Sequence, residues 1–433
     1  MKRYAWTLLK NWKNSETRKP LILWGARQVG KTWLMKEFGK EEYKDTLYIN
    51  FDSNPKFCDY FKNDISPDTI IKSLEIHFNK KIDAQNTLII FDEIQECQRA
   101  KDALKYFNEL APQYNIISAG SFLGVATGKF PVGQVDNLTL YPMSFYEFLE
   151  AIGEDQLLSA IKEKNYTIIN NFTDRLKTRL KEYYYVGGMP EAVNNYVKEK
   201  DLSTVREIQN QILQEYRNDF SKHILAKDIS KVQMIWDSIP SHLAREKKKF
   251  IYKDIKVGGR AAEFENAMTW LINTGLVYKV SKIFKPQIPL ARGEEREIFK
   301  LFMLDTGLLC AKANIDISSF YLSDKDIFSD FCGAITEQYV CQELKSQGFH
   351  DVFYWGNKEG KSEVDFLIQN KSDVIPIEVK SETNTKALSL KVYAEMYKPN
   401  TVIKTSMNMF RVENRNYFIP LYLMESLKNI VEG

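Results

Sequence analysis

The strongest constraint on the fold is a short glycine-containing pattern that follows an apolar run near the N-terminus. Leu21, Ile22 and Leu23 predict a buried strand, and the residues after them fit the pattern GxxxxGK[ST]. Glycine lets the backbone curl so that successive N–H groups point inward, and the helix predicted next adds its positive end. The pattern therefore predicts a phosphate-binding loop, made of Gly25, Ala26, Arg27, Gln28, Val29, Gly30, Lys31 and Thr32.

A second apolar run predicts the chemistry that acts on those phosphates. Lys31 would reach the β- and γ-phosphates, and the Thr32 hydroxyl would ligate Mg²⁺. Residues 88–91 are apolar and end in Asp92 and Glu93. Asp92 can hold the Mg²⁺ through water, and Glu93 can polarise the attacking water. ATP and Mg²⁺ are therefore the expected cofactors, and ATP hydrolysis is the expected reaction. The alternatives are an ordinary glycine-containing turn at residues 25–32 and a solvated acidic turn at Asp92 and Glu93, and the presence of both motifs in one chain argues against them.

A third apolar run, YNIISAGS, ends near Ser121. We expect this strand to lie beside the one that carries Asp92, where a polar side chain could sense the γ-phosphate. Ser121 is the candidate for that role, and a simple strand-end turn is an equally good interpretation. Short apolar runs alternate with helical patterns from residue 20 to 150, which predicts a parallel α/β sheet.

The remaining length predicts further domains, because 433 residues exceed one ordinary domain. Changes in the pattern of apolar and helical residues along the chain predict four regions. They are a phosphate-binding core (1–150), a helical region (151–225), short helices with two β-rich runs (226–320) and a mixed α/β end (321–433). Five scattered cysteines form no CxxC pair, which indicates a reducing compartment. We expect a cytoplasmic protein without signal peptide or membrane contact, because no window approaches the roughly 18 apolar residues of a membrane span.

The charge of the chain is concentrated in one segment. The net charge is +3, but residues 241–300 contain 13 Lys or Arg and 7 Asp or Glu. Their pattern predicts helix, short helix, helix ending at Gly275, then two strands, which is the order of a winged helix. Two interpretations stay open: DNA binding through the basic residues, or a solvated interdomain module. The acidic residues of the second strand, Glu294, Glu295 and Glu297, favour the latter.

A carboxylate–lysine pattern follows near the C-terminus. Asp365 lies in the run EVDFLI, and Glu378-Val379-Lys380 ends the run VIPIEVKS. Residues two apart on a strand share a face, so Glu378 and Lys380 point the same way. Asp365 and Glu378 could hold a Mg²⁺ that bridges a phosphodiester, while Lys380 orients or deprotonates the attacking water. The layout resembles the PD-(D/E)XK nuclease fold, and that resemblance implies Glu337 as a further metal ligand. A polar cluster at strand ends is the alternative.

The motifs together resemble one protein family. GARQVGKT, LIIFDEIQ, SAGSFLG, LYPMSFYEFLEA and GGMPEAV look like a large bacterial and archaeal family of AAA-type P-loop ATPases. Its members carry a C-terminal region described as a domain of unknown function. The resemblance extends from about Pro20 to past Lys380. It implies an AAA-like core, a helical lid, a winged helix and a restriction-endonuclease-like C-terminal domain.

Two functions follow from this architecture. The first is a Mg²⁺-dependent ATPase that acts on or regulates DNA, through the winged helix and a C-terminal domain that could be a metal-dependent nuclease. The second is a nucleotide-dependent protein-interaction switch with a catalytically silent nuclease-like scaffold, because a fold does not confer activity. The sequence allows a homo-oligomer. Arg99 and Arg179 are candidate arginine fingers, although solvated helix faces are the better interpretation of both.

Overall fold

The computed structural model describes residues 1–121, 133–316, 326–381 and 387–431. They divide into an N-terminal unit, Lys2–Tyr141 with Asn273–Leu276, and a C-terminal unit, Pro142–Ile272 with Val277–Gly433. The structure thus gives two units, while the finer division into four regions, with a helical lid at residues 151–225, stays a prediction. No helix in the described ranges is long and apolar enough to cross a membrane.

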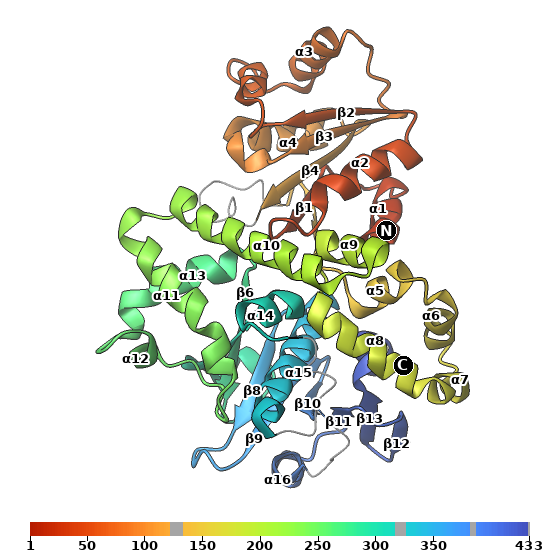
Figure 1. The fold of residues 1–433 in the computed structure, drawn as a ribbon. Helices are drawn as coiled ribbons and strands as arrows, with labels where there is room; N and C mark the ends of the chain where they lie inside the picture. The colour runs from red at the N-terminus through yellow and green to blue at the C-terminus, as the bar shows by residue number, and fades with distance from the viewer. Residues whose placement is uncertain (122–132, 317–325, 382–386, 432–433) are drawn as a thin grey trace. The chain divides into compact units, whose positions relative to one another are not determined.

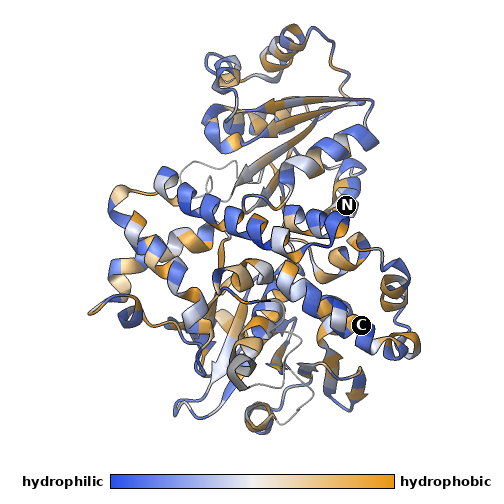
Figure 2. Cartoon of the chain, viewed as in Figure 1, coloured by the Kyte–Doolittle hydropathy of each residue, from blue (hydrophilic) through white to orange (hydrophobic). Residues whose placement is uncertain are grey.

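The N-terminal unit is built on a parallel sheet. Its strands are β1 (Leu21–Gly25), β2 (Asp45–Asn50), β3 (Thr87–Asp92), β4 (Asn115–Ser121) and β5 (Asp136–Thr139). They lie in the order β2-β3-β4-β1-β5 and pair in parallel throughout (Figure 1). The strands β1 and β3 are buried along their whole length and are mostly orange in Figure 2. The parallel α/β core predicted from the alternating apolar runs is confirmed.

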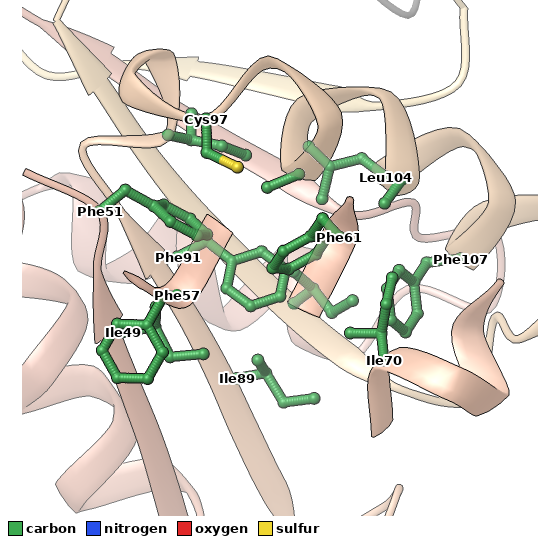
Figure 3. Packing of buried hydrophobic residues seen from close by; sticks show 14 of the residues in the cluster. Ile49, Phe51, Phe57, Phe61, Ile70, Ile89, Phe91, Cys97, Leu104 and Phe107 are labelled. Atoms are coloured by element: carbon green, nitrogen blue, oxygen red, sulfur yellow. The ribbon is translucent and has the colours of Figure 1, made fainter. Parts of the chain in front are cut away.

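Helices cover this sheet and fix the end of β3. They are α1 (Ala5–Lys13), α2 (Lys31–Glu42), η1 (Pro55–Phe61), α3 (Pro67–Phe78), η2 (Ile94–Glu96) and α4 (Gln98–Leu110). Figure 3 shows the apolar cluster in which Phe51, Phe61 and Phe91 meet. The ring centroids of Phe61 and Phe91 are 5.8 Å apart and edge to face, a favoured aromatic geometry. This packing holds Phe91 and therefore positions the carboxylate that follows it.

A mixed sheet forms the centre of the C-terminal unit. Its strands are β6 (Val277–Ile283), β7 (Glu294–Met303), β8 (Val352–Gly356), β9 (Glu363–Asn370), β10 (Asp373–Val379), β11 (Val402–Ser406), β12 (Arg411–Glu413) and β13 (Asn416–Pro420). Their order is β12-β13-β11-β10-β9-β8-β6-β7. The strands β6 and β7, predicted as a wing, form an antiparallel pair, and β6 also pairs in parallel with β8. The predicted wing is therefore one edge of the C-terminal sheet.

Helices make up most of the rest of this unit. They are α5 (Phe145–Ala151), α6 (Asp155–Lys162), α7 (Tyr166–Asn171), α8 (Thr173–Val186), α9 (Pro190–Glu199), α10 (Leu202–His223), α11 (Ala226–Leu243), α12 (Tyr252–Ile255), α13 (Ala261–Asn273), η4 (Leu290–Gly293), α14 (Thr306–Lys312), α15 (Asp326–Ser346), α16 (Leu388–Tyr397), η6 (Leu421–Ser426) and α17 (Leu427–Val431). The long α10 shows a mainly hydrophilic side in Figure 2. The elements α11, α12, α13, β6 and β7 follow the predicted order, while their assignment as a winged helix stays a prediction.

The GGMP break lies in a tightly packed turn. Gly188 N–H donates to Asp305 Oδ2 at 2.6 Å, and Met143 N–H donates to the Gly188 carbonyl at 2.6 Å. A Cβ at Gly188 would overlap the Met143 carbonyl, so the turn requires glycine there. Burial raises the pKa of Asp305 to about 6, against the opposing effect of the backbone donors. Two stretches that carry the family resemblance, PMSFYEFL and GGMPEAV, therefore meet in one part of the C-terminal unit.

Candidate functional site

The predicted phosphate-binding loop connects β1 to α2 directly. Gln28 and Gly30 have φ angles of 65° and 95°, in the left-handed region, and α2 begins at Lys31. Alternation of left- and right-handed residues turns backbone N–H groups into one concavity, the arrangement that binds phosphate. A Cβ at Gly25 would overlap the Leu140 carbonyl oxygen, so glycine is needed where β1 ends. The backbone therefore fits a bound phosphate chain.

Lys31 is a buried cation held by backbone oxygens. Its ammonium donates to the carbonyls of Gly25 at 3.0 Å and Ala26 at 2.8 Å, and the residue is 6% exposed. Burial lowers the pKa of Lys31 to about 8, although nearby Glu93 and Asp92 oppose this shift. A buried ammonium with only carbonyl partners in the described residues is suited to a phosphate, whose negative charge would compensate it.

Asp92 lies at the carboxyl end of β3, where its carboxylate meets the loop. Its Oδ2 accepts hydrogen bonds from the Thr32 hydroxyl at 2.7 Å and from the Tyr48 hydroxyl at 2.8 Å. Thr32 and Asp92 are thus neighbours, as a shared Mg²⁺ would require, and both offer the oxygen atoms that this ion prefers. Tyr48 was missed by the sequence reasoning, because nothing in the run TLYINF distinguishes it from a core aromatic residue.

Glu93 follows in a strained conformation. Its φ is 51°, in the left-handed region that non-glycine residues rarely adopt, and its side chain is half-buried. Gln95 Nε2 donates to Glu93 Oε2, which fixes the carboxylate. Such strain persists where surrounding contacts hold it and is frequent at functional sites. A glutamate held in place directly after the end of β3 suits the predicted role of Glu93 as the base for the attacking water.

The strand β4 lies between β1 and β3, as predicted for the strand beside Asp92. Ser121 is its last residue and pairs with Gly25, but the Ser121 side chain lies outside the described part of the structure. Its role as a sensor therefore stays a prediction. Arg3 was missed: its guanidinium donates to the carbonyl of Val29 at 2.9 Å and to that of Tyr141 at 2.7 Å. It fixes the loop from outside the motif.

The predicted C-terminal residues come together around lysines. Asp365 on β9 and Glu378 on β10 lie on neighbouring antiparallel strands, and Glu337 comes from α15. Lys380 Nζ lies 2.7 Å from Glu378 Oε1, in agreement with a shared face. Two lysines that the sequence reasoning did not assign to the site join them. We name the group of Lys248, Lys300, Glu337, Glu363, Asp365, Glu378 and Lys380 the C-terminal cluster.

Lys300 occupies the interior of this cluster. It extends from β7, its side chain is 2% exposed, and its Nζ lies 2.7 Å from Glu363 Oε1 and 3.4 Å from Glu337 Oε2. Asp365 Oδ1 is 4.0 Å away. Lys248 pairs with the other carboxylate oxygen of Glu337. The signal in the sequence was a lysine inside the apolar run EIFKLFM, which indicates a buried and therefore paired ammonium.

The lysines control the charge of the cluster. Burial disfavours the charged form of Lys300, but Glu337, Glu363 and Asp365 outweigh this effect and raise its pKa well above the usual range. Burial also acts against the charged form of Glu337, yet Lys248 and Lys300 lower its pKa to about 2. Burial, reinforced by Glu337 and Glu378, raises the pKa of Asp365 well above its ordinary value. Charge in this region is therefore neutralised from within.

A cavity of about 540 Å³ opens beside the cluster, and its lining includes Arg245, Lys248, Glu337 and Lys380. Within the described ranges, no three or more His, Cys, Asp or Glu side chains are arranged to hold a metal ion. The metal role predicted for Glu337, Asp365 and Glu378 therefore stays a prediction, and their observed partners are ammonium and N–H groups.

Other candidates also have partners within the chain. Arg99 Nε donates to the Phe61 carbonyl at 2.6 Å, and Arg179 pairs with Glu154 at 2.7 Å. In the basic segment, Lys248 belongs to the C-terminal cluster, whereas Lys247 is exposed. The segment is therefore not a uniform surface of free lysines.

Comparisons with known proteins assign the N-terminal unit. Residues 17–149 match the family described as AAA domain. Residues 177–319 match a domain of unknown function (DUF8612), and residues 332–424 match another (DUF4143). The AAA match and the loop geometry make the N-terminal unit a P-loop ATPase domain of the AAA type, with a nucleotide-binding site. No curated protein matches the chain.

Solved structures show distant likenesses. A Walker-type ATPase of Pyrococcus abyssi is 15% identical, with 72% of this chain and 95% of that chain covered at a TM-score of 0.44. The AMPPCP-bound DnaA of Aquifex aeolicus is 13% identical, with 62% and 86% covered at a TM-score of 0.26. The assignment of the N-terminal unit comes from the AAA match and the loop, and these likenesses add nothing to it.

Proposed function

We propose that this protein is a Mg²⁺-dependent ATPase. The observation that carries the proposal is the meeting of Lys31, Thr32 and Asp92 at the carboxyl ends of β1 and β3. Lys31 would bind the phosphates, and Thr32 with Asp92 would hold Mg²⁺, which neutralises phosphate charge when bound. Glu93, held by Gln95, would take the proton of the attacking water.

The test is ATP turnover by the purified chain with Mg²⁺, after chelation, and in the variant Thr32→Ala. We expect turnover that needs Mg²⁺ and that falls in the variant, because the hydroxyl beside Asp92 is lost. Thr7→Ala, an exposed threonine on α1, is the matched control. Turnover that is equal in Thr32→Ala and Thr7→Ala would place the metal elsewhere.

For the C-terminal unit, the proposed partner is DNA. Burial lowers the pKa of Lys282 against the opposing effect of Glu363, and Lys249 and Lys247 add to the lowering, so three lysines lie near one another and near Glu363 of the C-terminal cluster. Such a group gains binding energy by releasing counterions from phosphates, and affinity should fall steeply with salt. The double variant Lys247→Glu/Lys249→Glu should weaken binding to any DNA sequence. Lys248 is left intact because it pairs with Glu337.

The matched control for DNA binding reverses two exposed lysines outside the basic segment, Lys222→Glu with Lys227→Glu. It changes the net charge equally. If both double variants lose affinity equally, the effect comes from overall charge and not from these two lysines. If both keep wild-type affinity, residues 241–300 are a solvated module that does not bind DNA.

For the nuclease-like cluster, the geometry supports the second function: a silent scaffold in a nucleotide-dependent interaction switch. Lys300 lies among the carboxylates that a nuclease would use for its metal. Plasmid DNA incubated with the purified protein and Mg²⁺ or Mn²⁺ should stay uncut. Cleavage that disappears in Lys380→Ala but persists in Lys31→Ala would establish a live nuclease instead.

A further inference from the structure

Most of the carboxylate oxygens of the C-terminal cluster are engaged by groups of the chain itself, whereas Glu378 Oε2 is buried without a hydrogen-bond partner among the described residues. Glu337 uses one oxygen for Lys248 and the other for Lys300, at 3.4 Å in the latter case. Asp365 Oδ2 accepts a hydrogen bond from the Val379 N–H at 2.8 Å. Glu378 Oε1 lies 2.7 Å from Lys380 Nζ. Apart from Glu378 Oε2, the oxygens named here, which the PD-(D/E)XK resemblance implies for a metal, are therefore directed at ammonium and N–H groups.

Lys300 is fixed in this position by more than its charge. Its side chain is 2% exposed, and its ammonium lies 4.9 Å from the centre of the Tyr354 ring, within cation–π distance. It extends from β7, and Val280 on β6 is its partner in the β6–β7 pair. Because β6 also pairs with β8, the backbone holds Lys300 against the carboxylates. The lysine cannot leave without exposing a buried, paired charge.

A divalent ion and this ammonium compete for the same oxygens. Mg²⁺ requires near-octahedral oxygen ligands at roughly 2.0–2.1 Å, whereas an ammonium is satisfied by three acceptors at hydrogen-bond distance. Glu337, Glu363 and Asp365 surround one ammonium, so a divalent ion bound to the same oxygens would lie against the positive charge of Lys300. The residues present do not fit the metal that the resemblance implies.

We infer that Lys300 is the resident cation of the C-terminal cluster and excludes divalent ions from it. The carboxylates come from the segment matched as DUF4143, whereas Lys300 comes from the segment matched as DUF8612. The two segments therefore share one cluster of paired charges, which ties the β6–β7 hairpin to the rest of the sheet. The inference deepens the proposed silent scaffold, by naming the residue that keeps it silent.

The test measures Mn²⁺ binding to nucleotide-free protein, by calorimetry and by electron paramagnetic resonance of the free ion. We expect Lys300→Met to gain Mn²⁺ affinity by about tenfold or more, in the range typical of two ligands coupled through one site. The gain should disappear in Lys300→Met/Asp365→Asn, which lacks the ligand. Lys279→Met removes a half-buried lysine of β6 outside the cluster, and we expect no gain from it.

Wild-type protein gives an independent outcome should Lys300→Met fail to fold. Mn²⁺ bound by wild type and lost in Asp365→Asn would overturn the inference, because the cluster would then accept a metal beside Lys300. Folded Lys300→Met without any gain in affinity would overturn it as well. Plasmid cleavage reports separately on the silent scaffold: wild-type cleavage refutes the scaffold, while the ion affinities alone decide the role of Lys300.

Discussion

The phosphate-binding loop and the C-terminal cluster each bury a lysine, but in opposite surroundings. Lys31 donates to backbone carbonyls at 2.8 and 3.0 Å, and burial lowers its pKa to about 8. Lys300 lies among carboxylates at 2.7, 3.4 and 4.0 Å, and they raise its pKa despite its burial. The direct hydrogen-bond partners of Lys31 carry partial negative charges, with Glu93 and Asp92 nearby, whereas the direct partners of Lys300 are carboxylates.

The difference separates a binding site from a scaffold. An ammonium removed from water is unfavourable unless an opposite charge compensates it. Among the described residues, Lys31 pairs directly with carbonyls and not with a carboxylate, so a ligand phosphate would supply the direct opposite charge, which makes phosphate binding favourable. For Lys300 it comes from the chain, which makes the local fold favourable and leaves no charge for a ligand. A buried lysine therefore indicates function or structure according to whether its partner is already present.

The largest expected effect breaks the chemistry of the first region alone. Glu93→Gln should lower the turnover number about 10²- to 10⁴-fold, because the shape is kept and the base is lost. ATP affinity should stay near that of wild type. Glu96→Gln, an exposed carboxylate nearby on η2, is the matched control in the steady-state assay. Wild-type turnover in Glu93→Gln would assign the water to another residue.

The next effect is structural and belongs to the second region. Lys300→Met should lower the free energy of unfolding by about 3–5 kcal/mol, because removing one partner leaves buried carboxylates uncompensated. Lys279→Met should change it much less. Denaturant unfolding, followed by tryptophan fluorescence without divalent ions, measures both variants. If Lys300→Met is as stable as Lys279→Met, the cluster does not depend on its ammonium.

The two regions also differ in how far the sequence predicts them. The loop was predictable because Gly25 to Thr32 are consecutive and the backbone itself makes the site. Asp92 and Glu93 follow a strand whose burial is visible in its composition. The position of β4 beside the strand that carries Asp92 was expected, whereas its position between β1 and β3 is known from the structure.

The C-terminal cluster was predictable only in part. Asp365, Glu378 and Lys380 lie on adjacent strands, so their spacing brings them together. Lys248 and Lys300 are distant in the chain and join only because β6 pairs with β8. That pairing depends on the tertiary fold and is not visible in the local sequence. The sequence pattern of β6 and β7 instead predicted the wing of a separate domain. Sequence patterns describe local chemistry well, and long-range neutralisation of charge poorly.

A smaller effect tests whether Lys31 needs a ligand for its charge. Lys31→Ala should weaken nucleotide binding about 10- to 100-fold, the equivalent of one or two charge-assisted hydrogen bonds. Lys40→Ala removes an exposed lysine from the same helix and should have no effect. Fluorescence titration with a nucleotide analogue measures both. Equal affinities in the two variants would contradict the assignment of Lys31 to the phosphates.

The most gradual effect, and the smallest per unit of pH, is the pH dependence that Lys31 gives the nucleotide-free protein. Its pKa is about 8 in the fold and about 10.4 in an unfolded chain. Between these values the unfolded chain binds the extra proton, so stability rises with pH, by at most about 1.4 kcal/mol per unit. Below pH 8 both states are protonated and this rise is absent.

Lys31→Met should therefore lack the rise between pH 8 and about 10.4, and the difference between its unfolding free energy and that of wild type should follow the pH in that window. When Mg²⁺ and ATP are added, wild-type protein should lose this rise of stability with pH and match Lys31→Met. The reason is that a phosphate beside Lys31 favours the charged form and returns its pKa towards the ordinary value. Lys40→Met should keep the wild-type slope. If nucleotide left the wild-type slope unchanged, the phosphates would not lie against this ammonium, and the contrast between Lys31 and Lys300 would lose its functional meaning.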